Sequence, residues 1–312
     1  MARDGMPRVA ILLATFQGET YLSQQLDSIA QSTGVDWLVR VSDDGSTDGT
    51  RQILDTYRDR WEPGRVSVVD GPRRGLSANF FSLIAGAPGG HDAYAFADQD
   101  DVWAPEKLER AATWLGTVAP STPALYCGRT RLIDATGRTI GYSPRFHRPP
   151  SFANALAQNL ASGNTMVFND ATRRLLQDTG GPGAMSAMHD WWTYLIVTGV
   201  GGVVRYDPEP MVQYRQHGGN QVGGHAGALE RAWRAGDLLQ GRLAQWTDRN
   251  DAALREVRSR LTPGNAAMFD EFSAARRAAL GARLRGLWRS GAYRQTKRGR
   301  IFFWTAAVLN RL

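Results

Sequence analysis

The sequence predicts an α/β fold in which a mixed, mostly parallel sheet is flanked by helices, and two observations lead to this prediction. Through the first 130 residues, short apolar runs alternate with amphipathic segments of helical period, the order that builds strand, helix, strand crossovers. Polar clusters follow three of the apolar runs, at residues 15–19, 42–48 and 98–101. In such sheets ligands bind beyond the carboxyl ends of the strands, so the clusters predict one binding site.

The first half of the chain is expected to supply the core of the sheet. Apolar runs and helical spacing predict strands over 8–15, 37–42, 65–70 and 92–97, and helices over 21–32, 50–60 and 78–87.

The second half is less regular. Its expected elements are a helix over 154–162, a strand over 165–168 and a helix that begins at His189 and Asp190. No linker of the length that separates domains interrupts residues 1–225. We therefore predict one domain there, in which the strand-end clusters lie within about 1–120 and the part from about 121 to 225 forms the substrate side, followed by a basic helical extension over 226–312.

Composition excludes several classes of protein. The single cysteine, Cys127, rules out an internal disulfide and favours a reducing compartment. The N-terminal apolar run is too short to span a membrane, which predicts a cytoplasmic protein. The net charge is +7, but residues 273–312 hold ten Arg or Lys and no Asp or Glu. Since the rest of the chain is close to neutral or slightly acidic, a nucleic-acid partner is not expected.

The segment FADQDDVWAP carries three carboxylates, Asp98, Asp100 and Asp101. Magnesium and manganese are usually held by one or two carboxylates together with substrate phosphates. In an extended segment Asp98 and Asp100 point the same way, so one could hold a sugar or ribose and the other a metal ion. Capping of the following helix is an equally good explanation of the cluster.

The segment VSDDGSTDGT ends an expected strand with adjacent acids. Turn chemistry explains its glycine, serine and threonine but does not require both Asp43 and Asp44. Asp43 is a candidate to accept the imide N–H of a uracil or thymine ring. Thr15, at the end of the first strand, and Asn79, in GLSANFF, are weaker candidates for nucleotide binding.

Asp190 stands at the expected start of a helix, beside Trp191 and Trp192. An acid in a partly apolar setting has a raised pKa and suits a general base that acts on a hydroxyl. Capping of the helix above a tryptophan core is the structural alternative.

Together and in this order, the motifs resemble the inverting nucleotide-sugar glycosyltransferases of the GT-A fold, family 2. The resemblance runs from about Arg8 to Val222 and rests on T-F-Q-G, D-D-G-S-T-D, D-Q-D-D-V-W-A-P-E-K-L, S-G-N-T and the late acid. Within the family, D-Q-D-D-V-W, H-D-W-W and Y-R-Q-H-G-G-N-Q-V-G are most similar to the bacterial rhamnosyltransferases that build polysaccharides.

This resemblance implies that about 1–120 is the nucleotide-binding half and about 121–225 the acceptor half, and it implies a role for each matching position. It implies an Mn2+ or Mg2+ cofactor, a nucleotide-diphosphate sugar donor, with dTDP-rhamnose the first to test, and a glycan or lipid-linked glycan acceptor. The implied positions are Thr15 and Glu19 in the nucleotide pocket, Asp43 on the pyrimidine, Asn79 beside the donor, Asp98 on its ribose or sugar, Asp100 on the metal, Asp190 as the base, and His217 at the diphosphate or metal.

Two departures from the family pattern matter. His189 stands where the family often has Glu, which leaves any acceptor role of that position open. The Gln-x-x-Arg-Trp signature of processive synthases is missing, so the resemblance implies transfer of single sugars.

The basic segment 273–312 mixes Arg with Leu, Trp and Phe. Such a segment can lie on an anionic bilayer, which predicts a peripheral protein at the inner face of the cell membrane. Packing on its own domain, or on a second subunit through the C-terminal helices, is the alternative.

Other functions remain open beside single-sugar transfer from dTDP-rhamnose. The donor could be another UDP- or dTDP-sugar, and the protein could be a catalytically silent nucleotide-sugar or membrane-binding protein. A sugar-phosphate nucleotidyltransferase would need a basic Gly-rich loop after the first strand, which ATFQGET does not provide.

Overall fold

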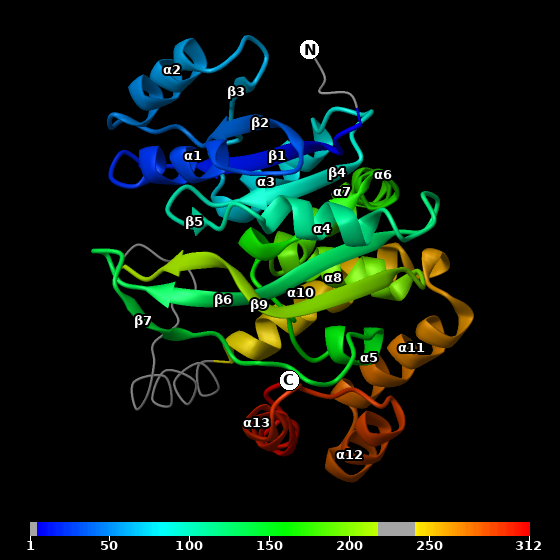
Figure 1. Ribbon diagram of the computed structural model, residues 1–312. Coiled ribbons are helices and arrows are strands. Elements are labelled where there is room, and N and C mark those ends of the chain that lie inside the picture. The colour runs from blue at the N-terminus through cyan, green and yellow to red at the C-terminus, as the bar shows by residue number, and fades with distance from the viewer. Residues whose placement is uncertain (1–4, 218–240) are drawn as a thin grey trace.

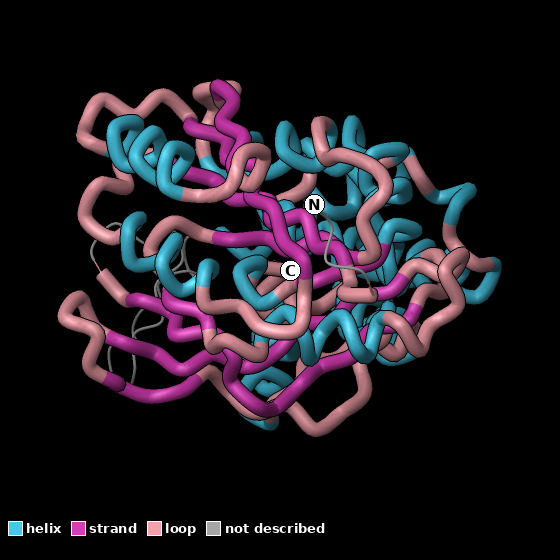
Figure 2. The backbone as a smooth tube through the Cα atoms, turned by 45° about the horizontal axis from the view of Figure 1, so that its top comes forward, coloured by secondary structure: helices cyan, strands magenta, loops and turns pink. Residues whose placement is uncertain are grey.

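The computed structural model describes residues 5–217 and 241–312 (Figure 1). A single mixed sheet runs through it, with helices on both sides (Figure 2). The strands are β1 (Arg8–Thr15), β2 (Asp36–Asp43), β3 (Val66–Asp70), β4 (Ala93–Ala97), β5 (Val102–Trp103), β6 (Ala124–Ile133), β7 (Thr139–Tyr142), β8 (Val167–Asn169) and β9 (Val203–Arg215).

The order of the strands is β3-β2-β1-β4-β8-β6-β9-β5, and β7 pairs with β6. The part formed by β3, β2, β1 and β4 is parallel, as the crossovers of the first half predict. β8 then enters antiparallel to both β4 and β6, while β9 runs parallel to β6. The carboxyl ends of β1, β2 and β4 therefore meet at one edge of the sheet, where the polar clusters follow them.

Helices cover the two faces of the sheet. They are α1 (Leu22–Ala30), α2 (Thr50–Arg60), α3 (Leu76–Ala85), α4 (Lys107–Leu115), α5 (Phe152–Ala155), α6 (Asp170–Asp178), α7 (Gly180–Met185), α8 (His189–Gly199), α10 (Arg242–Glu256), α11 (Pro263–Arg277), α12 (Leu280–Arg289) and α13 (Lys297–Val308), with short 3₁₀ helices η1 (Gly163–Thr165) and η2 (Arg258–Arg260). Alternate strand residues face α1, α2 and α4 on one side, and α3, α5, α6, α8 and the C-terminal helices on the other.

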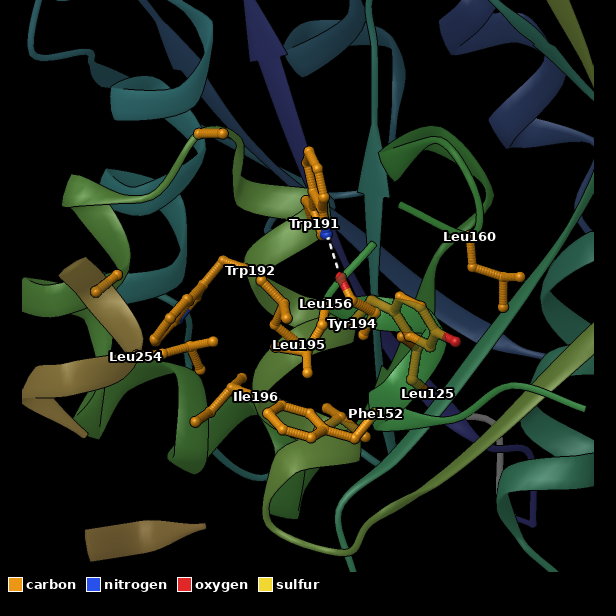
Figure 3. Close-up of a cluster of buried hydrophobic side chains, with 14 of the residues drawn as sticks. Leu125, Phe152, Leu156, Leu160, Trp191, Trp192, Tyr194, Leu195, Ile196 and Leu254 are labelled. Carbon is orange, nitrogen blue, oxygen red and sulfur yellow. Dashed lines mark hydrogen bonds between the residues drawn. The ribbon is translucent and has the colours of Figure 1, made fainter. Parts of the chain in front are cut away.

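The C-terminal helices belong to the same hydrophobic cluster as α8. Trp192 of α8 is fully buried, and Leu254 of α10 belongs to the same cluster (Figure 3). Trp191 is held by a hydrogen bond from its Nε1 to the carbonyl of Ala155, at 2.8 Å. This packing fixes the N-terminal end of α8, which carries Asp190.

The predicted α/β fold class, with its mostly parallel sheet and helical C-terminal extension, is confirmed. The expected helix over 154–162 is limited to the single turn of α5. Carbonyl groups at and after the end of α5 accept hydrogen bonds from side chains elsewhere: Ala155 accepts from Trp191, and Ala157 accepts from Arg294. These tertiary contacts replace the helical hydrogen bonds that local periodicity predicts.

Two sequence predictions fall on residues outside the described ranges. They are the second part of the Y-R-Q-H-G-G-N-Q-V-G motif, from Gly218 onward, and the boundary at 225/226 between the predicted domain and its extension. Among the residues that the structure does describe, every helix is too short or too polar to cross a bilayer.

Candidate active site

Asp43 lies at the end of β2 and is 1% exposed. Its Oδ1 accepts hydrogen bonds from the hydroxyls of Thr15, at 3.1 Å, and Ser46, at 2.5 Å. Its Oδ2 accepts from the backbone N–H of Ser46, at 3.2 Å, and from Nε of Arg51, at 2.6 Å. The turn after β2 thus folds back on the carboxylate, which joins the ends of β1 and β2.

A carboxylate offers about four acceptor positions, and the protein itself uses four at Asp43. A pyrimidine imide would therefore have to displace one of these donors. Arg51 is the most exposed of them, since its side chain is 40% exposed, and its second nitrogen binds Asp70 at the end of β3. The base-reading role of Asp43 stays a prediction, and it requires one of these donors, most readily the exposed Arg51, to move.

Glu19 and Asn79 also have partners within the protein. Glu19 accepts a hydrogen bond from the N–H of Gly49 at 2.6 Å, just before α2. The buried Asn79 donates to the carbonyls of Ser42, at 2.9 Å, and Thr15, at 3.5 Å. Asn79 thus ties β1 and β2 together below the site, and any contact of these two residues with a nucleotide stays a prediction.

The DQDD segment follows β4 and is attached to the loop after β1. The side-chain amide of Gln99 both accepts from the N–H of Phe16, at 2.8 Å, and donates to its carbonyl, at 2.9 Å. This double contact places Asp98 and Asp100 beside the Thr15 and Asp43 corner. Burial and the nearby charges of Asp100 and Asp190 raise the pKa of Asp98.

Asp100 forms a pair with His217, which follows β9. Nε2 of His217 lies 2.7 Å from Oδ2 of Asp100, and the His217 ring packs against Tyr21 with a centroid separation of 5.3 Å. The structure therefore brings together two residues, 117 positions apart in the chain, that the sequence assigned to the diphosphate and metal site.

Asp101 serves a different purpose from its neighbours because it is completely buried. Its Oδ2 accepts from the amide of Asn164 in η1, at 2.5 Å, and its Oδ1 accepts from the N–H of Arg215, at 3.2 Å. Burial, together with Asp100 and Asp98, raises its pKa well above the ordinary range. Asp101 joins the site to η1 and β9.

Arg215 is a central residue that the sequence reasoning did not single out. Its guanidinium is buried and donates to the carbonyls of Asp100, Asp134 and Ala135 and to the side chain of Gln24. It therefore joins the DQDD segment to α1 and to the hairpin of β6 and β7. The only signal in the sequence was its place in the Y-R-Q-H motif, and Asn164 likewise stood in the S-G-N-T motif.

The carboxylate ligands at this site fit a divalent cation whose coordination would be completed by the diphosphate of a substrate. Within residues 5–217 and 241–312, no group of three or more His, Cys, Asp or Glu side chains is placed to hold a metal. Magnesium and manganese, however, usually take only one or two carboxylates from the protein and the rest from phosphates and water. The raised pKa values of Asp98 and Asp101 indicate that nearby positive charge would be favourable. Asp100 is the carboxylate that would hold the ion.

Asp190 lies in the first turn of α8 and is 5% exposed. Its Oδ1 accepts from the N–H of Trp191 at 2.7 Å, and its Oδ2 accepts from the N–H of Gly163 at 3.2 Å. Burial raises the pKa of Asp190 to about 6, although these hydrogen bonds and Asn159 act in the opposite direction. At neutral pH the carboxylate is therefore ionised but basic enough to accept a proton.

His189, beside the predicted base, is packed as an aromatic ring. It stacks on Phe80 with centroids 3.9 Å apart and meets Phe96 edge to face. Burial lowers the pKa of His189 to about 3, and neither ring nitrogen has a hydrogen-bond partner among the described residues. The residue is therefore neutral, and its ring packs tightly against Gly163, where an added Cβ would lie 2.6 Å from Nε2.

Comparison with known sequences identifies relatives of the chain. The family described as Glycosyl transferase family 2 matches residues 10–175, slightly more than half of the chain. The dTDP-rhamnosyl transferase RfbG of Shigella flexneri is 27% identical over 222 residues, which are 68% of this chain and 73% of the relative.

Solved structures resemble the fold over nearly the whole chain. Staphylococcus aureus TarS in complex with UDP-GlcNAc has a TM-score of 0.54 at 15% identity. The match covers 92% of this chain and 93% of the TarS chain. The mannosyltransferase PcManGT from Pyrobaculum calidifontis, in complex with GDP-Man and Mn2+, has a TM-score of 0.52 at 18% identity, over 99% of this chain and 87% of that one. These likenesses show the GT-A fold. Since the matched region covers more than half of the sequence and contains Thr15, Asp43 and the DQDD segment, the chain belongs to glycosyl transferase family 2.

Proposed function

We propose that this protein is a metal-dependent inverting glycosyltransferase that moves one sugar from a nucleoside-diphosphate donor to a hydroxyl group. The observation that carries this proposal is the position of Asp190. The buried Asp190 carboxylate accepts from the N–H of Gly163, and the next residue, Asn164, donates to Asp101 of the DQDD segment, so a base stands beside the expected donor site. Similarity to the rhamnosyl transferase RfbG makes dTDP-rhamnose the first donor to test.

One group of residues would bind the nucleotide, and Asp190 would act on the acceptor hydroxyl. Thr15, Glu19, Asp43 and Asn79 would shape the nucleotide pocket at the ends of β1 and β2. The carboxylate of Asp190 would take the proton of the acceptor hydroxyl while the acceptor oxygen attacks the anomeric carbon. A single displacement of this kind breaks the bond to the diphosphate and inverts the anomeric centre.

Asp98, Asp100 and His217 would lie at the diphosphate end of the donor. A divalent cation bound by Asp100 would supply electrostatic stabilisation of the charge that develops on the leaving diphosphate. The proximity of His217 to Asp100 supports the placement of both residues at this end.

The acceptor that we propose is a glycan or a lipid-linked glycan used in the synthesis of cell-surface polysaccharide. The missing Gln-x-x-Arg-Trp signature supports the transfer of single sugars. A lipid-linked acceptor would bring a cytoplasmic enzyme to the inner face of the cell membrane, and the basic C-terminal segment supports this location.

The test is a screen of dTDP-, UDP- and GDP-sugars against the purified protein, with and without Mn2+ or Mg2+. Bound ligand raises the midpoint of thermal unfolding, and released nucleotide reports donor hydrolysis. We expect a pyrimidine-diphosphate sugar to stabilise the protein and to be hydrolysed only with metal. Stabilisation without any turnover, even with candidate acceptors, would support a nucleotide-sugar-binding protein instead. The proposal fails if no nucleotide sugar either binds or reacts.

A further inference from the structure

Helix α13 presents an apolar stripe to solvent. Ile301 is 69% exposed, Val308 51% and Leu309 52%, and Trp304 completes the same surface. These positions follow the helical spacing of i, i+3, i+7 and i+8, so they lie on one side of the helix. The opposite side, with Phe303, Ala306 and Ala307, is buried against the protein.

Four of the ten basic residues in 273–312 join the C-terminal helices to one another. Arg276, with a side chain only 4% exposed, binds Asp248 and the carbonyl of Leu312. The buried Arg283 donates to the carbonyls of Ala307 and Ala278.

The other two of these four form ion pairs with neighbouring helices. Arg277 of α11 pairs with Asp251 of α10, and Arg289 of α12 pairs with Glu271 of α11. These four guanidinium groups hold the C-terminal helices together; Arg276 and Arg283 do so in buried positions, whereas the side chains of Arg277 and Arg289 are 57% and 66% exposed.

Among the described residues of 273–312, three exposed basic residues without an ion pair to another described residue lie on α13, and two more are Arg285 of α12 and Arg311 after α13. Lys297, Arg298 and Arg300 are exposed, and none of them forms an ion pair with a residue in the described part of the chain. Lys297 and Arg300 border the apolar stripe directly. Helix α13 lies at the lower end of the molecule in Figure 1, far from α2 at the upper end.

We infer that the solvent-facing side of α13, formed by Lys297, Arg300, Ile301, Trp304 and Val308, docks the protein on an anionic lipid bilayer. An amphipathic helix of this kind inserts its apolar side chains at the interface while its cations meet lipid phosphates. A second copy of the chain is a poorer occupant, because a two-fold contact would place this cationic rim against itself.

This inference deepens the proposed membrane location by assigning it to one face of one helix, whereas the sequence pointed to all of residues 273–312. It does not rest on the transfer reaction. Lipid binding can be measured without donor or acceptor, so a failure of the proposed function and a failure of the docking surface are separate results.

The experiment is sedimentation of the full-length protein with vesicles of phosphatidylcholine, with and without phosphatidylglycerol. We expect binding only to the anionic vesicles, and weaker binding as the salt concentration rises. The double variant Lys297→Gln/Arg300→Gln should bind about 30-fold more weakly, from about 1 kcal/mol for each basic residue near the surface. The double variant Ile301→Ser/Val308→Ser should lose binding by about tenfold or more.

A matched control is Ile140→Ser in β7, which removes an isoleucine that is 41% exposed on another element. It should bind as the unchanged protein does. All variants alter exposed side chains, and their thermal unfolding midpoints will show that they are folded. Equal binding by the α13 variants would overturn the inference. So would a dimer in analytical ultracentrifugation that Ile301→Ser/Val308→Ser dissociates, because the stripe would then be a contact between two copies.

Discussion

Replacement of Asp190 by asparagine tests the assignment of the base. The change removes the proton acceptor and keeps the size of the side chain. A positioned general base contributes about 10² to 10⁴ in rate, so kcat should fall by that factor. Nucleotide binding should change far less than kcat, because Asp190 accepts hydrogen bonds from Gly163 and Trp191 rather than from the nucleotide-pocket residues.

The structure also gives the expected effect of this change on stability. The pKa of Asp190 rises from 3.8 to about 6 on folding, which corresponds to about 3 kcal/mol lost from the stability of the ionised protein. Because the folded-state pKa is raised, this destabilisation is absent below about pH 4 and complete above about pH 6. The substituted amide would relieve it, but its NH2 group would face the N–H of either Gly163 or Trp191 and leave that donor unpaired, at about 1–3 kcal/mol.

The two effects nearly cancel at neutral pH, so the variant is expected to be folded while it is inactive. The assay measures kcat and KM for nucleotide release with an acceptor, and urea unfolding for each protein. In the unchanged enzyme, kcat/KM should decrease as the pH falls through about 6, because the base becomes protonated. Asp207→Asn is a matched control, since it changes another buried aspartate, paired with Arg110, away from the strand ends. If kcat of the Asp190→Asn variant is within tenfold of that of the unchanged enzyme, the assignment of Asp190 as the base is refuted.

Three further predictions concern other parts of the site. Asp100→Asn should lower the transfer rate by about 10²-fold or more and abolish its increase with added Mn2+; an unchanged metal response in steady-state assays would contradict the role of this carboxylate. Gly163→Ala would place a Cβ 2.6 Å from Nε2 of His189 and 3.4 Å from Cβ of Asp190. The resulting displacement of Asp190 should lower kcat by about 10²-fold. An unchanged kcat would contradict this, because it would show that the protein accommodates the added Cβ without moving Asp190. Arg215→Met should lower the free energy of unfolding by about 3–5 kcal/mol in urea titrations, because it removes a buried cation and leaves its carbonyl partners unpaired. A loss below about 1 kcal/mol, the range of a surface ion pair, would contradict this.

The pattern of the sequence was sufficient to predict the fold class and the edge of the sheet that carries the site. Alternation of apolar runs and amphipathic segments is a local property, and the parallel direction of the strands in the first half follows from it. The ends of β1, β2 and β4 had to meet, so Thr15, Asp43 and Asp98 could be grouped from the chain alone. Their individual roles in donor binding remain predictions.

Only the tertiary structure decided which polar residues are already engaged. The sequence does not show that Asp100 pairs with His217, or that Asp101 is buried against Asn164 and Arg215. These partners are 63 to 117 residues away, and no local pattern reports such distances. The same holds for α13, where the exposed stripe and its cationic rim became visible only after the contacts of the other arginines were known. Periodicity therefore determined the type of the elements in the first half of the chain, while burial and long-range pairing determined which side chains are available to bind.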